Sequence, residues 1–320
     1  MEWRHLRDDD LEDVARLLRR ALPYVPLTDA EVRFLLSGDP GYDPALAWVA
    51  VAGEADGAPG EAGGAGRLVG IAAGAAADEA LQAPAGIKLF AVAPEFRRRG
   101  VATRLLDLAE GALRARGETR CAAVNCGTNR LALGLDVNYT AALCLLWQRG
   151  YERTGTTQDM IVDLTGPDAP PLDTAADEAR LAAAGVVFRR AGAADRAWVE
   201  AGVAQELAAS VPGRRWAYLA GLAFRGDPPA IEVAADRETG AWLGFAAYDV
   251  ARVGSLGPMG VAPGSRARGA GAVLLKRCLR DLRDAGYPRA EIFAVGPIPF
   301  YAKTVGARFG RIYYQYTRTL

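Results

Sequence analysis

The chain has 320 residues, of which 51% are hydrophobic and 24% are charged, a balance typical of a globular protein. Its 38 basic and 38 acidic residues cancel to a formal net charge of zero, which argues against a protein that binds nucleic acid through bulk positive charge. Residues 1–18 carry charges throughout, and no run reaches the roughly 18 apolar residues of a membrane helix, so we expect a cytoplasmic protein with no signal peptide and no membrane partner.

The first half of the chain predicts alternating strands and helices. Residues 3–22 read as a short strand, an acidic helix cap and an amphipathic helix. Three segments of strand-like composition follow, at 45–53, 66–76 and 86–92. Segment 103–117 then places apolar residues at helical spacing and ends at Gly117, which suits the left-handed position that follows a helix. A short strand is expected at 121–126.

The second half repeats this order after a break. Proline and glycine gather within residues 166–171 and a short helical stretch follows, so we place a linker at 166–184 between domains 1–165 and 185–320. Residues 186–207 again predict a strand and a helix. The later elements are strands at 230–236, 241–250 and 255–261, a helix at 272–286 and a strand at 291–295. Each half is therefore expected to be an α/β (α+β) domain, with a mixed, mostly antiparallel sheet flanked by helices.

A repeated motif marks the same strand–helix junction in both halves. VAPEFRRRGVATRLL at 92–106 and VAPGSRARGAGAVLL at 261–275 are identical at 8 of 15 positions, with an offset of 169 residues. The first turn of a helix has unpaired N–H groups and the positive end of the macrodipole, so a glycine and arginines at this place predict a phosphate site. A plain connection with solvated arginines is the competing interpretation, and the second copy argues against it. The absence of G-K-[ST] excludes a P-loop, and the arginines replace the first glycine of a dinucleotide fingerprint.

These two motifs resemble the acetyl-CoA-binding motif of the GNAT superfamily of N-acetyltransferases. The resemblance extends to YTAALCLLWQRGYERTG at 139–155 and PFYAKTVGARFGRIYYQY at 299–316, which look like the last helix and strand of that family. It covers the chain apart from the linker and implies a tandem protein with two GNAT domains. It also implies acetyl-CoA (coenzyme A) as the cofactor, with its pyrophosphate on the loop amides, its pantetheine arm along the strand, and its thioester carbonyl near the N–H of Val92 or Val261. The implied cofactor-binding residues are Phe90, Ala91, Val92, Arg97, Arg98, Arg99, Gly100, Val101, Ala102, Thr103, Met259, Gly260, Val261, Arg266, Ala267, Arg268, Gly269, Ala270, Gly271 and Ala272.

The same resemblance implies a tyrosine on the last helix that serves the leaving thiolate. Tyr301 is this catalytic candidate in the second half, one residue further from Gly306 than the usual pattern, whereas Leu146 stands at the corresponding place in the first half. A tyrosine that packs in the core is the competing interpretation of Tyr301. Asp249 and Glu291 are candidates for the general base, and a water chain is the alternative to both.

Metal and disulfide chemistry is not expected. The four cysteines form no CxxC pair, and His5 is the single histidine that could join them. This set favours buried thiols in a reducing compartment over a zinc site or a disulfide framework.

Together these features predict an acetyl-CoA-dependent N-acetyltransferase that modifies a primary amine of a small molecule or peptide. The alternative is a CoA-binding sensor or pseudoenzyme in which one or both domains are non-catalytic. A third interpretation is that one domain binds the acceptor or completes the cleft of the other. No nucleic-acid, membrane or metal partner is expected, and the sequence leaves the acceptor and the choice between monomer and homodimer open.

Overall fold

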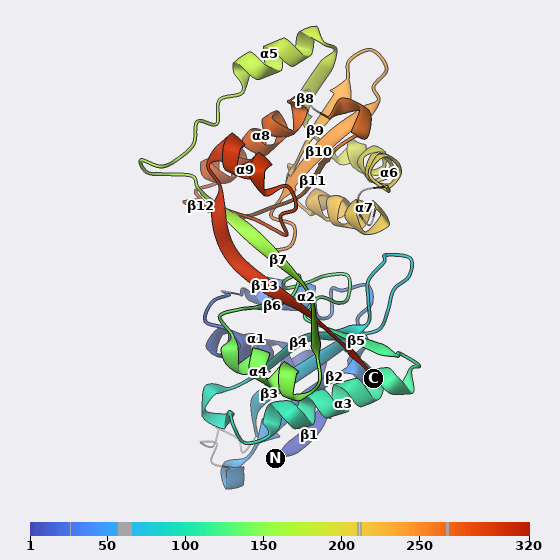
Figure 1. Cartoon of the computed structure of the whole chain (residues 1–320), viewed down its shortest axis with the longest axis vertical. Coiled ribbons are helices and arrows are strands. Elements are labelled where there is room, and N and C mark those ends of the chain that lie inside the picture. The colour runs from blue at the N-terminus through green and yellow to red at the C-terminus, as the bar shows by residue number, and fades with distance from the viewer. Residues whose placement is uncertain (26, 57–65, 210, 212, 267–268) are drawn as a thin grey trace. The chain divides into compact units, whose positions relative to one another are not determined.

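Two long strands, β7 (Glu152–Asp163) and β13 (Arg308–Thr319), decide how the chain divides into units. In the computed structural model, which describes residues 1–25, 27–56, 66–209, 211, 213–266 and 269–320, unit 1 comprises Met1–Thr157 with Tyr313–Leu320, and unit 2 comprises Gln158–Ile312. The expected domains, 1–165 and 185–320, differ from these units in that each unit holds strand residues that chain order would give to the other. Figure 1 shows the strands and helices of each unit, coloured along the chain.

Unit 1 is built on a sheet with the strand order β1-β2-β3-β4-β5-β13. The strands not yet defined are β1 (Glu2–His5), β2 (Ala47–Ala52), β3 (Arg67–Ala75), β4 (Gly86–Val92) and β5 (Arg120–Ala123). Neighbouring strands are antiparallel except β4 and β5, which are parallel, and the short β6 (Leu135–Asp136) also pairs with β13. The end of the chain therefore supplies the strand that follows β5 in this sheet.

The helices of unit 1 are α1 (Leu11–Ala21), α2 (Asp29–Leu35), α3 (Val101–Ala115) and α4 (Thr140–Gln148). The crossover helix α3 packs against β2, β3 and β4, and α1 packs against β3 and β4. The close approach of α3 depends on Gly70, because a Cβ atom there would lie 2.9 Å from Leu105 Cδ1 and 3.0 Å from Val101 Cγ1. The apolar residues of these strands and helices form one buried core that also includes Tyr313 and Tyr316 of β13.

Unit 2 repeats the architecture with the strand order β8-β9-β10-β11-β12-β7. Its further strands are β8 (Val186–Arg190), β9 (Ile231–Asp236), β10 (Trp242–Tyr248), β11 (Ser255–Val261) and β12 (Arg289–Ile292). Its helices are α5 (Ala175–Ala183), α6 (Arg196–Glu206), α7 (Gly213–Leu222), α8 (Ala270–Asp284) and α9 (Ile298–Val305). Only β11 and β12 are parallel neighbours, and residues 160–163 of β7 pair with β12. The predicted fold class, a mixed sheet flanked by helices in each of two units, is confirmed.

Both crossover helices end as their sequences predict. Gly117 and Gly286 follow α3 and α8 with left-handed φ angles of 84° and 94°. The N–H of Glu118 donates to the Leu113 carbonyl at 3.2 Å, and the N–H of Tyr287 donates to the Leu282 carbonyl at 3.1 Å. These bonds satisfy carbonyl groups that have no partner within the helix.

Candidate functional site

In unit 1 the two parallel strands pair over a short length and then separate. Their last pair is Ile87↔Ala123, which we call the separation point of unit 1, and the Val124 N–H closes it with a 2.7 Å hydrogen bond to the Ile87 carbonyl. Val124 has a left-handed φ of 66°, which ends β5 sooner than the expected strand and turns the chain away from the sheet. Within the described residues, segment 88–92 of β4 has no strand partner on this side.

Unit 2 has an equivalent separation point at Leu256↔Ile292. The N–H of Phe293 donates to the Leu256 carbonyl at 3.0 Å, and the left-handed Ala294, with a φ of 56°, again directs the chain away from the sheet. In both units the chain therefore turns away from the sheet just after the separation point, and the two separation points lie at the same offset as the repeated motif.

Backbone amides point into the gap between the separated strands. On the edge of β4 that faces β3, away from the gap, the Ala93 N–H donates to the Val69 carbonyl at 2.8 Å. On the edge of β11 that faces β10, the Ala262 N–H donates to the Leu243 carbonyl at 2.9 Å. Hydrogen-bonding groups alternate along an antiparallel strand. The N–H groups of Phe90, Val92, Met259 and Val261 therefore face the gap, which is the position expected of groups that pair with an extended ligand.

The first arginine of each motif supports the loop. The Arg97 Nε donates to the Val92 carbonyl at 3.2 Å, and the Arg266 Nε donates to the Val261 carbonyl at 3.3 Å. The Arg97 Nη2 also donates to the Ala21 carbonyl at the end of α1, at 3.1 Å. This guanidinium is thus engaged by the backbone on two sides, and its structural role could not be read from the sequence.

The later motif residues lie at the surface around the helix start. Arg98 and Gly100 have left-handed φ angles of 61° and 80°, and Gly269 has one of 97°. The Arg99 guanidinium lies over the Phe96 ring at 5.1 Å from its centroid. Arg98 and Arg99 are exposed and supply positive charge beside Gly100. Two expected binding residues, Ala267 and Arg268, lie outside the described residues.

The starts of α3 and α8 expose backbone N–H groups. In α3 the first intrahelical bond runs from the Arg104 N–H to the Gly100 carbonyl at 3.0 Å, so the amides of the preceding residues 101–103 have no acceptor in the helix. In α8 the amides of Ala272 and Val273 both reach the Gly269 carbonyl, at 3.1 and 3.3 Å. With the positive end of the macrodipole, each start has the charge and donors that suit a phosphate.

Tyr301 and Leu146 hold matching positions at the ends of α9 and α4. The Leu146 carbonyl accepts from the Tyr151 N–H at 3.0 Å, and the Tyr301 carbonyl accepts from the Ala307 N–H at 3.4 Å. The extra residue before Gly306 is taken up by a wider last turn, so Tyr301 is aligned with Leu146 in spite of the longer spacing. Tyr301 is 7% exposed and Leu146 is fully buried.

The sequence of the chain matches a model of the acetyltransferase (GNAT) family over residues 13–135 and 197–307, well over half of its length. The chain belongs to the GNAT family. The two matched regions fall in the two units, so it is a tandem GNAT protein, as its motifs predict.

Solved structures agree on the fold. A tandem GNAT protein from the clavulanic acid biosynthesis pathway is 17% identical, with a TM-score of 0.64 over 99% of this chain and 98% of that one. A GCN5-related N-acetyltransferase from Sphaerobacter thermophilus is 19% identical, with a TM-score of 0.69 over 99% of this chain and 95% of that one. A GCN5-related glucosamine N-acetyltransferase region of a fungal multi-domain β-N-acetylglucosaminidase is 18% identical, with a TM-score of 0.73 over 99% of this chain. The present chain spans 38% of that fungal protein, and no curated protein matches its sequence.

In the first GNAT unit, a buried ion pair lies beside the separation point. Lys88 forms an ion pair with Asp39, whose side chain is fully buried. Asp39 also accepts from the N–H groups of Thr128, Asn129 and Gly41, at 3.1, 2.8 and 2.8 Å. Burial lowers the pKa of Lys88, against the opposing effect of Asp39. This pair was not expected from the sequence, although a lone lysine inside the apolar strand GIKLFAV is a signal of a buried partner.

The two candidate bases of the second GNAT unit are both engaged. Asp249 accepts from the Gly254 N–H at 2.6 Å and so closes the turn between β10 and β11. Glu291 lies 3.1 Å from a guanidinium nitrogen of Arg252 and 3.1 Å from one of Arg311. Burial raises the pKa of Glu291, while both arginines favour its ionised form. Of the two, Glu291 is beside the separation point, because it immediately precedes Ile292.

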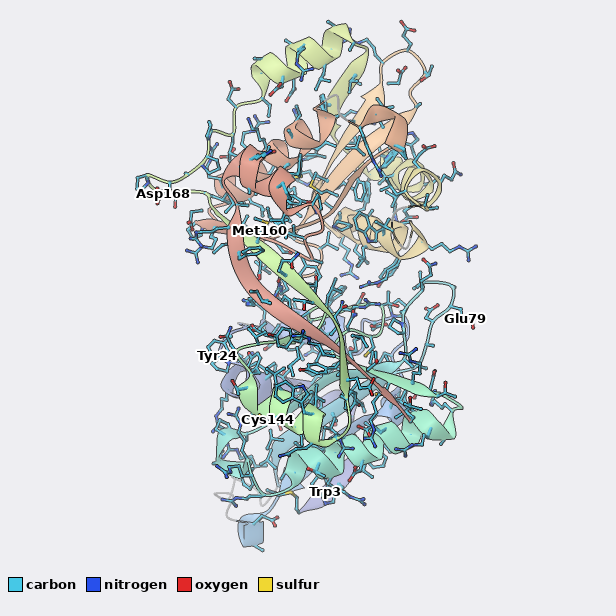
Figure 2. The ribbon with its side chains drawn as sticks, in the orientation of Figure 1. Trp3, Tyr24, Glu79, Cys144, Met160 and Asp168 are labelled. Atoms are coloured by element: carbon cyan, nitrogen blue, oxygen red, sulfur yellow. The ribbon has the colours of Figure 1, made fainter. Side chains whose placement is uncertain are left out.

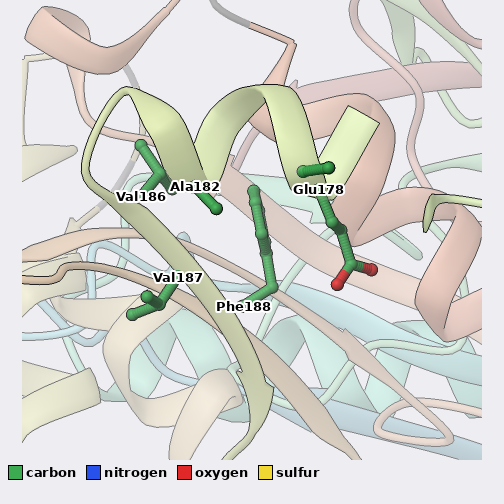
Figure 3. Close-up of a pocket in the computed structure, with 6 residues that line it drawn as sticks. Glu178, Ala182, Val186, Val187 and Phe188 are labelled. Carbon is green, nitrogen blue, oxygen red and sulfur yellow. The ribbon is translucent and has the colours of Figure 1, made fainter. Parts of the chain in front are cut away.

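Other features lie away from the motif. A cavity of about 300 Å³ lies between α5 and β8 and is lined by Glu178, Ala179, Ala182, Val186, Val187 and Phe188. Figure 3 shows Glu178 at one end of it. Of the four cysteines, Cys144 on α4, labelled in Figure 2, is exposed, and the other three are buried. The described residues include no group of three or more histidine, cysteine or acidic side chains that could hold a metal ion. None of the described helices has the length and apolar character needed to cross a lipid bilayer.

Proposed function

We propose that the protein is an acetyl-CoA-dependent N-acetyltransferase that acts on a primary amine of a small molecule or peptide. Membership of the GNAT family supports acyl transfer. The choice of acetyl-CoA as the acyl donor depends on one repeated combination, a separated strand edge followed by an arginine-bearing helix start. The strand edge suits an extended pantetheine arm, and the helix start suits a diphosphate. Both parts recur in the same order in each unit.

The diphosphate would lie on the N–H groups of residues 99–103 in one unit and 269–271 in the other. Arg98 and Arg99 would add positive charge to the first of these loops. The pantetheine arm would run from the diphosphate along the strand and pair with the N–H groups of Val92 and Val261. The N–H of Phe90 or Met259, which lies nearer the separation point, would polarise the thioester carbonyl, where negative charge develops as the tetrahedral intermediate forms.

In the reaction, the amine nitrogen attacks the thioester carbon, the C–N bond forms, and the C–S bond breaks to release the CoA thiolate. A lysine-like amine with a pKa near 10.4 must first lose its proton, at a cost of about 5 kcal/mol at neutral pH. Glu291 or an ordered water would accept a proton from the attacking nitrogen.

Tyr301 would act on the leaving sulfur. Burial raises the pKa of Tyr301 to about 12, so the phenol keeps its proton at physiological pH. A thiol has a pKa of about 8.5, so complete transfer of the phenol proton to the thiolate would cost about 5 kcal/mol. Tyr301 is therefore proposed to donate a hydrogen bond to the developing thiolate, which takes its final proton from water.

The test is CoA release from acetyl-CoA in the presence of a panel of primary amines, with mass spectrometry of the products. The panel includes glucosamine, because one structural neighbour is described as a glucosamine N-acetyltransferase region. Tyr301→Phe should lower kcat about 100-fold, the lower range for a general acid or hydrogen-bond donor, while leaving the affinity for acetyl-CoA unchanged. Tyr314→Phe is the matched control, because it removes one phenol hydroxyl from unit 1 and should leave kcat unchanged.

Three outcomes separate the alternatives. Release of CoA with an acetylated amine supports the transferase. Binding of acetyl-CoA with no release above hydrolysis, across the whole panel, contradicts it and supports a CoA-binding sensor. Equal kcat values for the wild type and Tyr301→Phe would contradict the proposed role of Tyr301 but not the transferase activity.

A further inference from the structure

Lys88 and Gly257 occupy the same position in the two units. Each is the first residue of its strand beyond the separation point, after Ile87 in unit 1 and after Leu256 in unit 2. Position for position, one unit has a long cationic side chain where the other has only a hydrogen atom. In the proposed acyl-CoA complex, the acyl group would lie in the space that the separated strands leave at this position.

In unit 1 the space beyond the separation point is filled. A Cβ atom built at Gly127 would lie 3.2 Å from Ala75 Cβ, 3.2 Å from Asp39 Oδ2 and 3.3 Å from Lys88 Nζ. Three different elements therefore meet at this point, and the ion pair is among them. The described segment 126–132 that follows β5 is buried throughout.

In unit 2 the position equivalent to Lys88 leaves room, because Gly257 has no side chain. At Gly257 the nearest atoms to such a Cβ are the Phe293 carbonyl oxygen at 3.8 Å and the Phe293 Cβ at 4.0 Å. The matched positions Lys88 and Gly257 thus differ in the space that they leave beyond the separation point.

From this comparison we propose that the N-terminal unit binds CoA but has its acyl chamber closed by the Lys88–Asp39 pair, so that acyl transfer is confined to the C-terminal unit. The inference rests on the proposed function, and it assigns the two units different roles. Leu146 agrees with it, because the closed unit also lacks the phenol that Tyr301 supplies in the open one.

The closure is held firmly enough to exclude a ligand. Asp39 is fixed by three backbone N–H groups, so it cannot move aside with Lys88 unless these donors lose their acceptor. Displacement of Lys88 alone would leave a buried carboxylate without its counter-ion, which is strongly unfavourable. An acyl group that needs this space therefore competes with an ion pair that the fold already satisfies.

The first experiment compares CoA with acetyl-CoA by calorimetric titration of the full chain. Ala102→Trp and Gly271→Trp, which place a bulky side chain at equivalent positions in the first turns of α3 and α8, assign each binding event to a unit. CoA should bind at both sites. Acetyl-CoA should bind as well as CoA in the C-terminal unit but at least about tenfold more weakly than CoA in the N-terminal unit, the size expected when a satisfied buried pair is disturbed.

Lys88→Ala should remove the difference between the two ligands in the N-terminal unit, because it opens the space. Circular dichroism checks that this variant folds, and Lys88→Met with Asp39→Asn provides a second variant that removes both charges while keeping most of the volume. This double variant should retain the preference for CoA over acetyl-CoA, because the space stays filled.

A second experiment follows turnover. Leu146→Tyr should leave kcat unchanged, and it should fail to restore the activity lost in Tyr301→Leu, because a phenol in the closed unit meets no thioester. Equal CoA and acetyl-CoA affinities at both sites, or rescue of Tyr301→Leu by Leu146→Tyr, would overturn the inference. A single CoA site that Gly271→Trp abolishes would overturn it as well. If CoA bound at neither site, the proposed function itself would be contradicted.

Discussion

Arg318, on the last strand of the chain, forms an ion pair with Glu110 of α3 at 2.9 Å. Glu110 is 1% exposed, and it also binds a guanidinium nitrogen of Arg149 at 2.9 Å and the Tyr151 hydroxyl at 3.0 Å. Because α3 carries the motif of the first GNAT unit at its start, the end of the chain is attached to the helix that positions this motif.

Removal of residues 313–320 should therefore destabilise unit 1 before unit 2. The deletion takes away the strand beside β5 and two buried side chains, Tyr313 and Tyr316, each 1% exposed. Loss of a large aromatic side chain from a core costs about 3–5 kcal/mol, so two such losses approach the whole stability of a typical domain. Hydrogen exchange resolved by peptide should show faster exchange in residues 1–157 than in 158–312, and equal protection of both would contradict the assignment of the strand.

Glu110→Gln should lower the free energy of unfolding by about 2 kcal/mol, because the buried side chain loses its charge-assisted hydrogen bonds to the partly buried guanidinium groups of Arg149 and Arg318. Asp107→Asn is the matched control on the same helix. Asp107 binds the same Arg149 at 2.7 Å but its side chain is 51% exposed, so its loss should cost less than about 1 kcal/mol. Urea titrations of both variants measure the difference, and similar costs for the two would show that the burial of Glu110 has no special effect.

The raised pKa of Tyr301 predicts a pH dependence at alkaline pH. Between the unfolded pKa of about 10 and the folded pKa of about 12, the folded protein holds a proton that the unfolded chain has lost. The free energy of unfolding should fall as pH rises through this window, by up to about 3 kcal/mol, and be unaffected by this group below it. Tyr301→Phe removes the contribution, so the stability difference between wild type and variant should be constant up to about pH 9 and shrink above about pH 10. A difference that stays constant through pH 12 would mean that the pKa of Tyr301 is not raised and that the phenol is not buried in solution.

Thiol labelling should single out Cys144. It is exposed, whereas burial raises the pKa of Cys121 to about 11 and also raises the pKa of Cys126 and of Cys278. Because the thiolate is the reactive form, the three buried thiols are protected by both low access and low ionisation. Brief treatment of the native protein with iodoacetamide should modify Cys144 alone, as peptide mass spectrometry would show. Labelling of Cys278 at a comparable rate would contradict the packing of α8.

The local features of the fold could be predicted from the sequence. The motif, the crossover helices and their terminal glycines Gly117 and Gly286 depend on residues within a few positions of one another. The repeated motif then indicates that these elements follow one another in the same order in both halves. The alignment of Tyr301 with Leu146 needed the structure, because the extra residue before Gly306 could have shifted the tyrosine by a third of a turn.

The features that escaped prediction depend on distant residues. Lys88 and Asp39 lie 49 positions apart, and no pattern in either segment identifies the other as its partner. Chain order assigns β7 to the first half and β13 to the second. The two strands have the same length of 12 residues, and nothing in either sequence indicates that part of the strand joins the sheet of the other unit. The early end of β5 depends on the left-handed backbone of Val124, a conformation that a β-branched residue rarely adopts and that no propensity would suggest.

Residues 158–163 of β7 belong to unit 2, and residues 313–319 of β13 belong to unit 1. This division also sets the order in which the two sheets can be completed during synthesis. The first unit cannot acquire its sixth strand until residues 313–320 have left the ribosome, because those residues are the strand beside β5. The second unit, in contrast, receives residues 158–163 before most of its own sheet has been translated. The half that is made first is therefore the last to be completed, and a nascent chain interrupted in its final residues would carry an unfinished N-terminal sheet beside a finished C-terminal one.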